Sequence, residues 1–255
     1  MRIEFFAIPG IPEILPGDDV GAILARAAQA AGEKLLDADI ILVAQKIVSK
    51  SEGRFRTLSE IVPSAEALDI SARCGKDPRK VQAILDESSA IVRVSAAPPD
   101  GIVIARHKSG WVCANAGIDE SNLGSAEGRL LLLPVDPDAS ATRIADGILR
   151  LSGQRPGVIV TDTFGRPWRK GLVNVALGTS DVPPIINWVG KSDAYGRRLA
   201  VSEQAFADEL AAVSGLLMVK DASTPAVVVR GLQWMRAESA TCRDYVRPAE
   251  QDLFK

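Results

Sequence analysis

The sequence has little of what many enzyme and nucleic-acid sites are built from. Of its 255 residues only one is a histidine, three are cysteines and 5% are aromatic, and the formal net charge is −2. Without an excess of basic residues the protein has no positive electrostatic field to attract a phosphate backbone. It also has few aromatic rings that could stack on bases. The composition therefore argues against nucleic acid as a partner.

The cysteines Cys74, Cys113 and Cys242 are far apart and form neither a CxxC metal pair nor a disulfide framework, which fits a reducing compartment. The apolar stretch at the N-terminus is too short for a signal peptide and contains prolines. No run approaches the roughly 18 apolar residues of a membrane span. We expect a cytoplasmic protein without a membrane partner.

Several catalytic motifs are missing as well. The sequence contains no GxxxxGK[ST] phosphate loop, no GxGxxG fingerprint and no GxSxG nucleophile elbow. A single histidine, His107, cannot supply a histidine-rich metal site. A lone histidine is more often structural than catalytic, so both interpretations of His107 stay open.

What the sequence does contain predicts a globular α+β protein. Hydrophobic residues make up 47% of the chain and charged residues 24%, and no linker divides it. We expect one domain over residues 1–255, built as two intimately packed subdomains. Strands and helices alternate irregularly, which favours mixed sheets with flanking helices over a doubly wound sheet.

The predicted elements follow from apolar periodicity and from turn and cap residues. Strands are expected over 2–8, 39–44, 90–95, 101–106, 129–135, 157–161 and 226–230. Helices are expected over 20–35, 57–72, 77–87, 138–151 and 202–218. Residues 45–53 are expected to form a loop, residues 163–184 a polar, glycine-rich passage, and the tail after 238 to be loosely held.

Two loops carry the side chains of oxygen-based chemistry. Residues 114–122 bring Asp119, Glu120, Ser121 and two asparagines into one segment. Hard cations such as Mg²⁺ take ligands of this kind and keep several waters and substrate phosphates. The alternative is a polar turn whose side chains satisfy their own backbone.

The second loop follows the apolar strand predicted over 157–161. A carboxylate at the carboxyl end of a strand, here Asp162, lies where α/β-type sheets place their ligands. Asp162 and the Thr163 hydroxyl can ligate a cation, and three basic residues can neutralise phosphate or carboxylate groups: Arg166, Arg169 and Lys170. The alternative is a loop of solvated charges. Lys46 and Lys50 follow another apolar strand and are a weaker sign of phosphate binding.

Taken together, these segments resemble the coenzyme F420-0:γ-L-glutamate ligase family, in the form without a fused flavin reductase domain. The matching stretches occur in the family's order and cover nearly the whole chain: Ile8-Pro9-Gly10-Ile11-Pro12, residues 45–53, residues 114–122, Thr161-Asp162-Thr163-Phe164-Gly165-Arg166-Pro167-Trp168-Arg169 and Asp193-Ala194-Tyr195-Gly196-Arg197. The sequence departs from the family's pattern at Ala44-Gln45, over 181–184 and over 186–188, and the last two, downstream of the basic loop, concern the acceptor more than the nucleotide chemistry.

The resemblance implies an enzyme that couples hydrolysis of GTP to GDP and phosphate with addition of L-glutamate to F420-0, and then of a further γ-linked glutamate. It implies an intertwined homodimer, Mg²⁺ or Mn²⁺ and a helper K⁺. By resemblance, Asp119, Asp162 and Thr163 match metal positions. Nucleotide positions are matched by Ile11, Pro12, Glu13, Ile14, Gln45, Lys50, Asn122, Met218, Val219, Lys220, Asp221, Ala222, Ser223, Thr224 and Pro225.

The expected mechanism needs no protein nucleophile. Phosphorylation of a carboxylate gives an acyl phosphate that an amine can attack, and catalysis then rests on positioning and charge neutralisation. Arg166 and Arg169 would hold the γ-phosphate or the anionic acceptor, and His107 and Glu120 are candidates for the base. Three alternatives remain: the same chemistry on another carboxylate and amine, a GTP-binding regulatory module without turnover, and a structural subunit.

Overall fold

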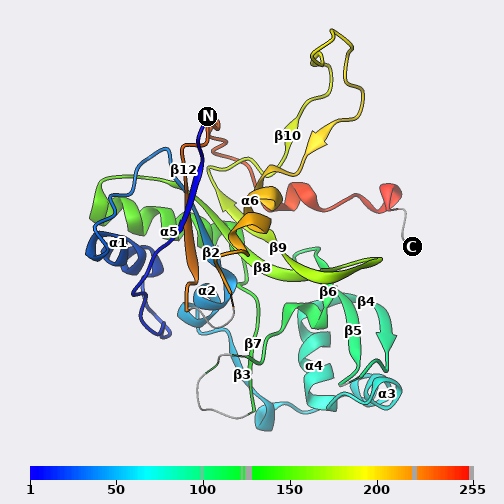
Figure 1. The fold of residues 1–255 in the computed structure, drawn as a ribbon. Coiled ribbons are helices and arrows are strands. Elements are labelled where there is room, and N and C mark those ends of the chain that lie inside the picture. The colour runs from blue at the N-terminus through cyan, green and yellow to red at the C-terminus, as the bar shows by residue number, and fades with distance from the viewer. Residues whose placement is uncertain (99, 122, 124–127, 220–222, 253–255) are drawn as a thin grey trace.

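The centre of the fold is a five-stranded sheet with the strand order β1-β12-β2-β8-β9 (Figure 1). Its strands are β1 Glu4–Ala7, β12 Ala226–Arg230, β2 Ile40–Ala44, β8 Gly157–Arg166 and β9 Arg169–Ser180. β2 and β8 run parallel, and every other neighbouring pair is antiparallel. The expectation of a mixed sheet is therefore confirmed. The computed structural model describes residues 1–98, 100–121, 123, 128–219 and 223–252.

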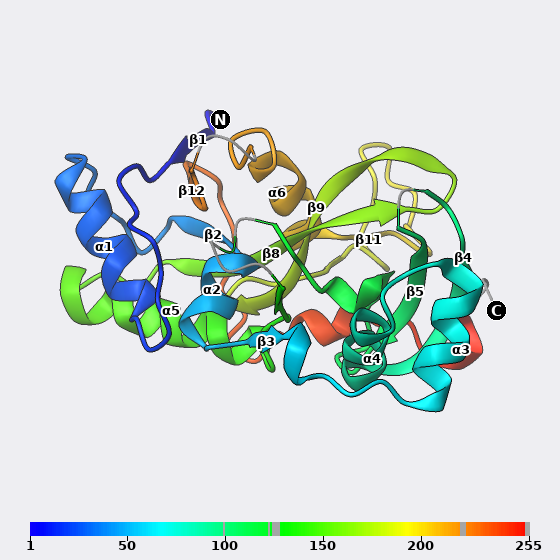
Figure 2. The same ribbon diagram turned by 90° about the horizontal axis from the view of Figure 1, so that it is seen from below.

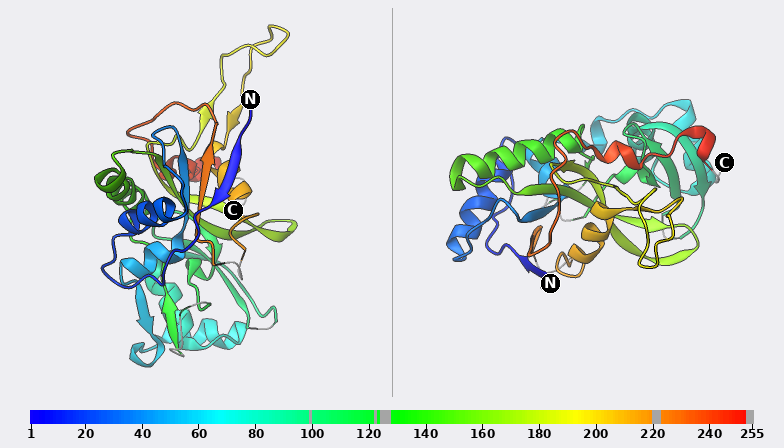
Figure 3. Two further views of the ribbon diagram at one scale, coloured as in Figure 1. Left: turned by 60° about the vertical axis from the view of Figure 1, so that its left-hand side comes forward. Right: turned by 90° about the horizontal axis from the view of Figure 1, so that it is seen from above.

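Helices cover both faces of this sheet, so its central strands are buried on both sides. Alternate residues of β2 point to opposite faces, and Ile41 and Val43 pack with α1 (Val20–Ala30) and α5 (Pro137–Ser152). Ile40 and Leu42 pack on the other face with α6 (Phe206–Ser214). A continuous apolar run such as Ile-Ile-Leu-Val is what burial on two faces requires. Figure 3 shows α1 and α5 on one side of the sheet and α6 on the other.

Side-chain caps fix where the predicted helices begin. The Asp19 carboxylate accepts a hydrogen bond from the backbone N–H of Ala22 at 3.0 Å, and Asp136 accepts one from Ala139 at 3.0 Å. Asp77 caps α4 (Pro78–Glu87) in the same way, with proline in the first turn. These helix starts agree with those predicted from the sequence.

A second lobe lies beside the main sheet and has its own core. It contains α3 (Ala65–Cys74), α4 and a three-stranded sheet of β4 (Ser88–Ser95), β5 (Ile102–His107) and β6 (Val112–Ala114). The two-stranded pair β3 (Phe55–Thr57) and β7 (Arg129–Leu131) connects it to the rest of the chain. Figure 2 shows α3 and α4 at the opposite end of the molecule from α1 and α5.

An extended arm leaves the body between β9 and α6 (Figure 1). Its base is the short antiparallel pair β10 (Ile186–Asn187) and β11 (Glu203–Gln204). Short 3₁₀ turns complete the described structure: Leu58–Glu60, Asn115–Gly117, Cys242–Tyr245 and Ala249–Gln251. Among the described residues, no helix is both long and apolar enough to cross a bilayer.

Several element boundaries differ from the prediction. Residues 45–51 form a helix, α2 (Gln45–Ser51), where a loop was expected. The helix predicted over 57–72 begins only after its Ser64 cap, because residues 55–57 pair with β7 and Pro63 precedes the cap. The first helix ends at Ala30 instead of 35, since Gly32 takes a left-handed φ of +80°.

The largest error concerns residues 163–184, expected to be an irregular passage. β8 continues through Asp162 to Arg166, and β9 returns beside it in a long hairpin. Toward its tip the hairpin is exposed and polar, so no alternating apolar pattern marks it as strand. Two predicted elements are also too long: the strand of 129–135 spans only Arg129–Leu131, and the helix of 202–218 spans only Phe206–Ser214.

The prediction for the tail is also wrong, because the segment around residue 242 is held more tightly than expected. Cys242 is fully buried in the core beside α6. The Tyr245 hydroxyl donates to the carbonyl oxygen of Pro184 at 2.7 Å and accepts from the N–H of Asp208 at 3.1 Å. The segment around residue 242 therefore contributes to the core.

The contact of α1 with α5 supplies a test of the fold. A Cβ on Gly21 would lie 2.3 Å from the carbonyl oxygen of Ile144 and 2.9 Å from the Cα of Gly147, all backbone atoms of α5. Gly21→Ala should lower the free energy of unfolding by about 1–3 kcal/mol through overpacking, although alanine is the better helix former by about 1 kcal/mol. Urea unfolding measures this. The control Arg26→Ala changes an exposed residue of the same helix, and equal stability of the two variants would contradict the close contact.

Candidate active site

Strand register brings four chain segments to one edge of the main sheet. In the parallel pair, Ala44 of β2 lies opposite Thr161 of β8, so the next residues of both strands emerge together. The N–H of Ala44 donates to the carbonyl oxygen of Pro225 at 2.8 Å, which places the segment entering β12 at the same edge. The N–H of Ile8 donates to Ala226 at 3.0 Å, so the segment leaving β1 also arrives there. Carboxyl ends of parallel strands are where open α/β sheets bind ligands.

A pocket of about 950 Å³ lies at this edge. Its lining combines the segments just described with residues 113–119 of the second lobe and with the near half of the β8–β9 hairpin. That volume is at the upper end for small-molecule sites and suits a large polar ligand or two ligands together.

Asp119 reaches the pocket on a backbone held in an uncommon conformation. Asn115 and Ala116 take positive φ values of 52° and 53°, and Gly117 follows with 71°. Such angles cost of order 1 kcal/mol or more for a non-glycine residue and persist where the surroundings fix them. Here Ala116 is fully buried, and Asp119 and Leu131 exchange two backbone hydrogen bonds of 2.9 Å. The Asp119 carboxylate is thereby aimed into the pocket by its main chain.

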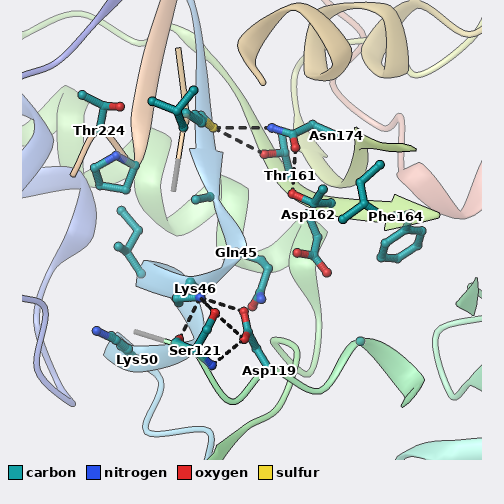
Figure 4. A pocket seen from close by; sticks show the side chains of 18 of the residues that line it. Gln45, Lys46, Lys50, Asp119, Ser121, Thr161, Asp162, Phe164, Asn174 and Thr224 are labelled. Atoms are coloured by element: carbon teal, nitrogen blue, oxygen red, sulfur yellow. Dashed lines mark hydrogen bonds and ion pairs between the residues drawn. The ribbon is translucent and has the colours of Figure 1, made fainter. Parts of the chain in front are cut away.

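The two oxygens of Asp119 have different partners (Figure 4). Oδ1 accepts hydrogen bonds from the N–H and the hydroxyl of Ser121, at 2.8 and 2.9 Å. Oδ2 forms an ion pair with Lys46 Nζ at 2.7 Å. Burial acts to raise the pKa of Asp119, but the contacts with Lys46 and Ser121 outweigh it and hold the pKa below its usual range.

Asp162 is the second carboxylate of the pocket, and Figure 4 shows it turned toward Gln45. Burial raises its pKa to about 7, and the negative charge of Asp119 acts in the same direction. The N–H of Thr163, the positive charge of Lys46 and the Gln45 side chain oppose the rise. The charge of Asp119 thus disfavours a second negative charge on Asp162, and a cation between the two carboxylates would relieve this repulsion.

Beyond Asp162 the hydroxyl of Thr163 is fixed by a buried amide. Thr163 Oγ1 donates to Asn174 Oδ1 at 2.8 Å, across the β8–β9 pair. Asn174 is buried, and its amide nitrogen lies 3.5 Å from the Ser214 hydroxyl. Because its proton points to Asn174, the Thr163 oxygen has its lone pairs free to face another group.

The donor set fits a hard divalent cation. Two carboxylates and the hydroxyl of Thr163 supply oxygen only, which Mg²⁺ and Mn²⁺ accept. Over the described ranges, no cluster of three or more His, Cys, Asp or Glu side chains forms a closed metal cage. A cation held by Asp119 and Asp162 would therefore take its remaining ligands from water or from a phosphate.

The predicted nucleotide positions gather around the same pocket. Every one of them that the structure describes lines it: Ile11, Pro12, Glu13, Ile14, Gln45, Lys50, Met218, Val219, Ser223, Thr224 and Pro225. Lys50 Nζ pairs with Glu13 Oε1 at 2.5 Å and is buried. The predictions for Asn122, Lys220, Asp221 and Ala222 lie outside the described residues.

The basic residues predicted to act beside Asp162 do not line the pocket. β8 does not stop at Asp162, and each further strand residue adds about 3.3 Å, so Arg166 lies about 13 Å along the strand. Arg166, Arg169 and Lys170 are exposed at the hairpin tip, and the carbonyl oxygen of Lys170 accepts a hydrogen bond from Arg166 Nη2 at 3.3 Å. No contact among the described residues brings them to Asp162.

His107 is likewise absent from the lining. It is buried in the second lobe, where its Nδ1 accepts from the N–H of Ser109 at 3.0 Å and its Nε2 lies 3.7 Å from Glu87. Glu120 is tied to Lys80 at 2.6 Å, also outside the lining. The described geometry therefore offers neither residue as a base beside the two aspartates.

Sequence reasoning gave too little weight to Lys46, and it missed Asn174, Phe164 and the contact of Ser121 with Asp119. Lys46 follows a buried strand, which is a common place for lysine, and its partner Ser121 lies 75 positions away. Asn174 becomes visible only once β9 is known to pair with β8. Phe164 lies within the Thr161–Arg169 motif, but nothing in the sequence shows that it faces the pocket.

The fold and the site define an α/β protein whose ligand pocket combines paired aspartates with lysines. The family model described as F420-0:Gamma-glutamyl ligase matches residues 10–231. The chain is 44% identical over 258 residues to the Coenzyme F420:L-glutamate ligase of Methanothermobacter thermautotrophicus, with 100% of both chains covered. It is 41% identical over 256 residues to that of Archaeoglobus fulgidus, covering 100% of this chain and 97% of the relative. The chain belongs to the F420-0:gamma-glutamyl ligase family, which confirms the resemblance.

The raised pKa of Asp162 predicts a pH-dependent stability of the ligand-free protein. A carboxyl whose pKa is higher in the folded than in the unfolded state favours folding at low pH, and this advantage is lost as pH rises from about 4 to about 7. Asp162→Asn should be more stable than the wild type, and its advantage should be roughly 2 kcal/mol or more larger at pH 8 than at pH 5. Urea unfolding without metal or nucleotide measures both. Asp100→Asn, on an exposed turn, is the control. Parallel pH profiles for wild type and Asp162→Asn would contradict the assignment.

Proposed function

We propose that this protein is a GTP- and divalent-cation-dependent ligase that joins L-glutamate to the carboxylate of F420-0, releasing GDP and phosphate. The observation that carries the proposal is the pocket itself. Strand register gathers the described metal and nucleotide positions implied by the family into one cavity. The relatives, which match over the full length of this chain, carry the name Coenzyme F420:L-glutamate ligase.

The dimensions and charges of the pocket support a nucleotide together with a second substrate. Ile11 and Ile14 supply apolar surface where β1 leaves the sheet, and Met218 supplies it beside Thr161 and Asn174. Lys46 and Lys50, on adjacent turns of α2, bring two positive charges toward the middle of the pocket. Phe164 and Leu172 line the hairpin side, where they would shield a reacting group from water. This arrangement suits phosphates in the middle, a base at one end and an acceptor at the other.

Asp119, Asp162 and Thr163 would hold Mg²⁺ or Mn²⁺ against the phosphates. The bound cation would neutralise phosphate charge, which phosphoryl transfer requires. In the ligand-free protein the lysines are engaged with carboxylates, Lys46 with Asp119 and Lys50 with Glu13. Both ammonium groups thus lie at the pocket wall, where they would bind phosphate oxygens as point charges.

The reaction follows from the chemistry of carboxylates. A carboxylate of F420-0 attacks the γ-phosphorus of GTP, the bond to the β-phosphate oxygen breaks, and GDP leaves. The amino group of glutamate then attacks the acyl phosphate carbon, and phosphate leaves with the bonding electrons. The amine loses a proton to form the amide. No residue of the chain needs to form a covalent bond, which agrees with a pocket lined by charges and amides.

The remaining expectations stay part of this proposal. The partners are the small molecules F420-0, L-glutamate and GTP, with K⁺ as a helper ion and the cytoplasm as the compartment. The described cysteines Cys74, Cys113 and Cys242 are free and buried, as suits a reducing environment. Ligation of another carboxylate with another amine would use the same phosphate and cation machinery.

Phosphate release and product mass test the proposed reaction together. With GTP, Mg²⁺ or Mn²⁺ and L-glutamate, phosphate release should depend on F420-0, and the product should be heavier by one or more glutamyl residues. Asp119→Asn should lower kcat/KM by about 100-fold or more, because the cation that neutralises the reacting phosphates would lose a charged ligand. Asp69→Asn, an exposed carboxylate of α3 paired with Arg73, is the matched control. GTP binding without turnover that depends on F420-0 would contradict the proposed substrate.

We further propose that the protein acts as a homodimer and that the β10–β11 arm belongs to the interface. The arm exposes apolar side chains away from the body: Val189 is 48% exposed, Tyr195 97% and Val201 87%. Clustered exposed apolar surface marks interaction sites.

Light scattering after size exclusion tests this. The wild type should have twice the 27.1 kDa chain mass, and Tyr195→Asp combined with Val201→Asp should shift it toward a single chain. Val62→Asp, at an exposed apolar residue outside the arm, should leave the mass unchanged. A dimer that survives the arm substitutions would place the interface elsewhere.

A further inference from the structure

The ammonium group of Lys46 contacts the loop that carries Asp119 at three points. Its Nζ lies 2.7 Å from Asp119 Oδ2, 2.8 Å from the carbonyl oxygen of Ser121 and 3.0 Å from the Ser121 hydroxyl. An ammonium group has three protons to donate, so these three acceptors account for its hydrogen-bonding capacity. Figure 4 shows the group enclosed between the two residues on the pocket side of α2.

Asp119 does not need Lys46 to be held in place. Its main chain exchanges two hydrogen bonds with Leu131, and Oδ1 accepts two from Ser121. The main-chain restraint is independent of Lys46, which touches Asp119 itself only at Oδ2 and otherwise binds Ser121. What Lys46 adds to Asp119 is therefore mainly a positive charge at its remaining oxygen.

That charge lies where a cation bound to Asp119 would have to be. Oδ1 is engaged with Ser121, so Oδ2 is the oxygen available to an incoming ion, and Lys46 already covers it. The same ammonium acts electrostatically on Asp162. Lys46 thus compensates both carboxylates in the ligand-free protein, and a bare cation must displace it first.

We propose that Lys46 is the resident counter-ion of the cation site: it occupies the cation's place on Asp119 in the ligand-free protein and moves to the phosphates when cation and nucleotide arrive together. The inference rests on the proposed function of the pocket. The flexible four-carbon stem of lysine allows the change of partner without movement of α2. Because Lys46 opposes the cation alone and assists the cation with nucleotide, it couples the two binding events.

Lys50 gives a useful contrast on the same helix. It is one turn further along α2 and pairs with Glu13 Oε1, not with the loop that carries Asp119. It should therefore contribute to nucleotide binding without competing with the cation. Of these two lysines of α2, it is Lys46 that is placed to weaken binding of the cation alone and to strengthen binding of the cation with nucleotide.

Mn²⁺ binding to the full chain, followed by electron paramagnetic resonance of the free ion, tests the inference with and without a non-hydrolysable GTP analogue. Without nucleotide, Lys46→Met should bind Mn²⁺ about fivefold more tightly than the wild type, because the competing ion pair is gone. With the analogue, it should bind Mn²⁺ roughly tenfold more weakly, because a charged contact to phosphate is lost. Lys46→Arg, which keeps the charge, should remain near the wild type without nucleotide.

The matched control is Lys80→Met. Lys80 is about as exposed as Lys46 and pairs with Glu120, the residue next to Asp119, but outside the pocket lining. Both Mn²⁺ affinities should therefore stay unchanged. Weaker or unchanged Mn²⁺ binding by nucleotide-free Lys46→Met would overturn the inference and leave Lys46 with a purely structural role. Absence of Mn²⁺ binding by the wild type in both conditions would overturn it together with the proposed cation site. Opposite changes in a protein that does not turn over F420-0 would support the role of Lys46 and sink only the substrate assignment.

Discussion

The parallel pairing of β2 with β8 is the interaction on which the site depends. It is the one parallel pair among the strands described in the main sheet, and it makes two buried strands end their shared register at the same edge, with Ala44 opposite Thr161. Gln45 and Lys46 then enter from one strand and Asp162 from the other. The antiparallel neighbours β12 and β1 reverse direction beside them, so their connecting segments close the same pocket. A shift of one residue in this register would turn Asp162 to the other face of the sheet.

The second lobe supplies the other carboxylate of the site, and it is positioned by backbone conformation instead of strand register. Its contribution, Asp119, is delivered by a short stretch of left-handed backbone and fastened to Leu131 by two hydrogen bonds. Bringing this carboxylate near Asp162 is unfavourable without a compensating charge, because both are partly removed from water. Lys46 supplies that charge in the ligand-free protein. The ligand-free pocket thus balances one ammonium group against two carboxylates, and under the proposed function this balance, not a preformed cage, prepares it for a cation.

The sequence predicts those parts of this arrangement that local patterns encode. The apolar runs of β2, β8 and β12 and the aspartate caps of α1, α4 and α5 are local signals, and they locate the sheet and the start of each helix. Asp162 and Asp119 are recognisable because each follows a strand or lies in a loop dense in oxygen ligands. The β8–β9 hairpin has no such signal beyond Asp162, since it is stabilised by cross-strand pairing and is exposed toward its tip. Because the hairpin was not foreseen, Arg166 and Arg169 were expected beside the aspartates. The ion pair between Lys46 and Asp119 could not be predicted either, since it joins residues too far apart in sequence for a local pattern to show.

The central claim is that Asp119 and Asp162 hold one divalent cation against a nucleotide phosphate. Anomalous diffraction from crystals grown with Mn²⁺ and a GTP analogue tests it most directly. The account predicts one strong peak about 2.1–2.3 Å from a carboxylate oxygen of each aspartate and from an oxygen of the phosphates. It also predicts that Lys46 Nζ has left Asp119 Oδ2 in that complex. A cation bound to the phosphates alone, with Lys46 still paired to Asp119 and Asp162 without a metal contact, would contradict the account.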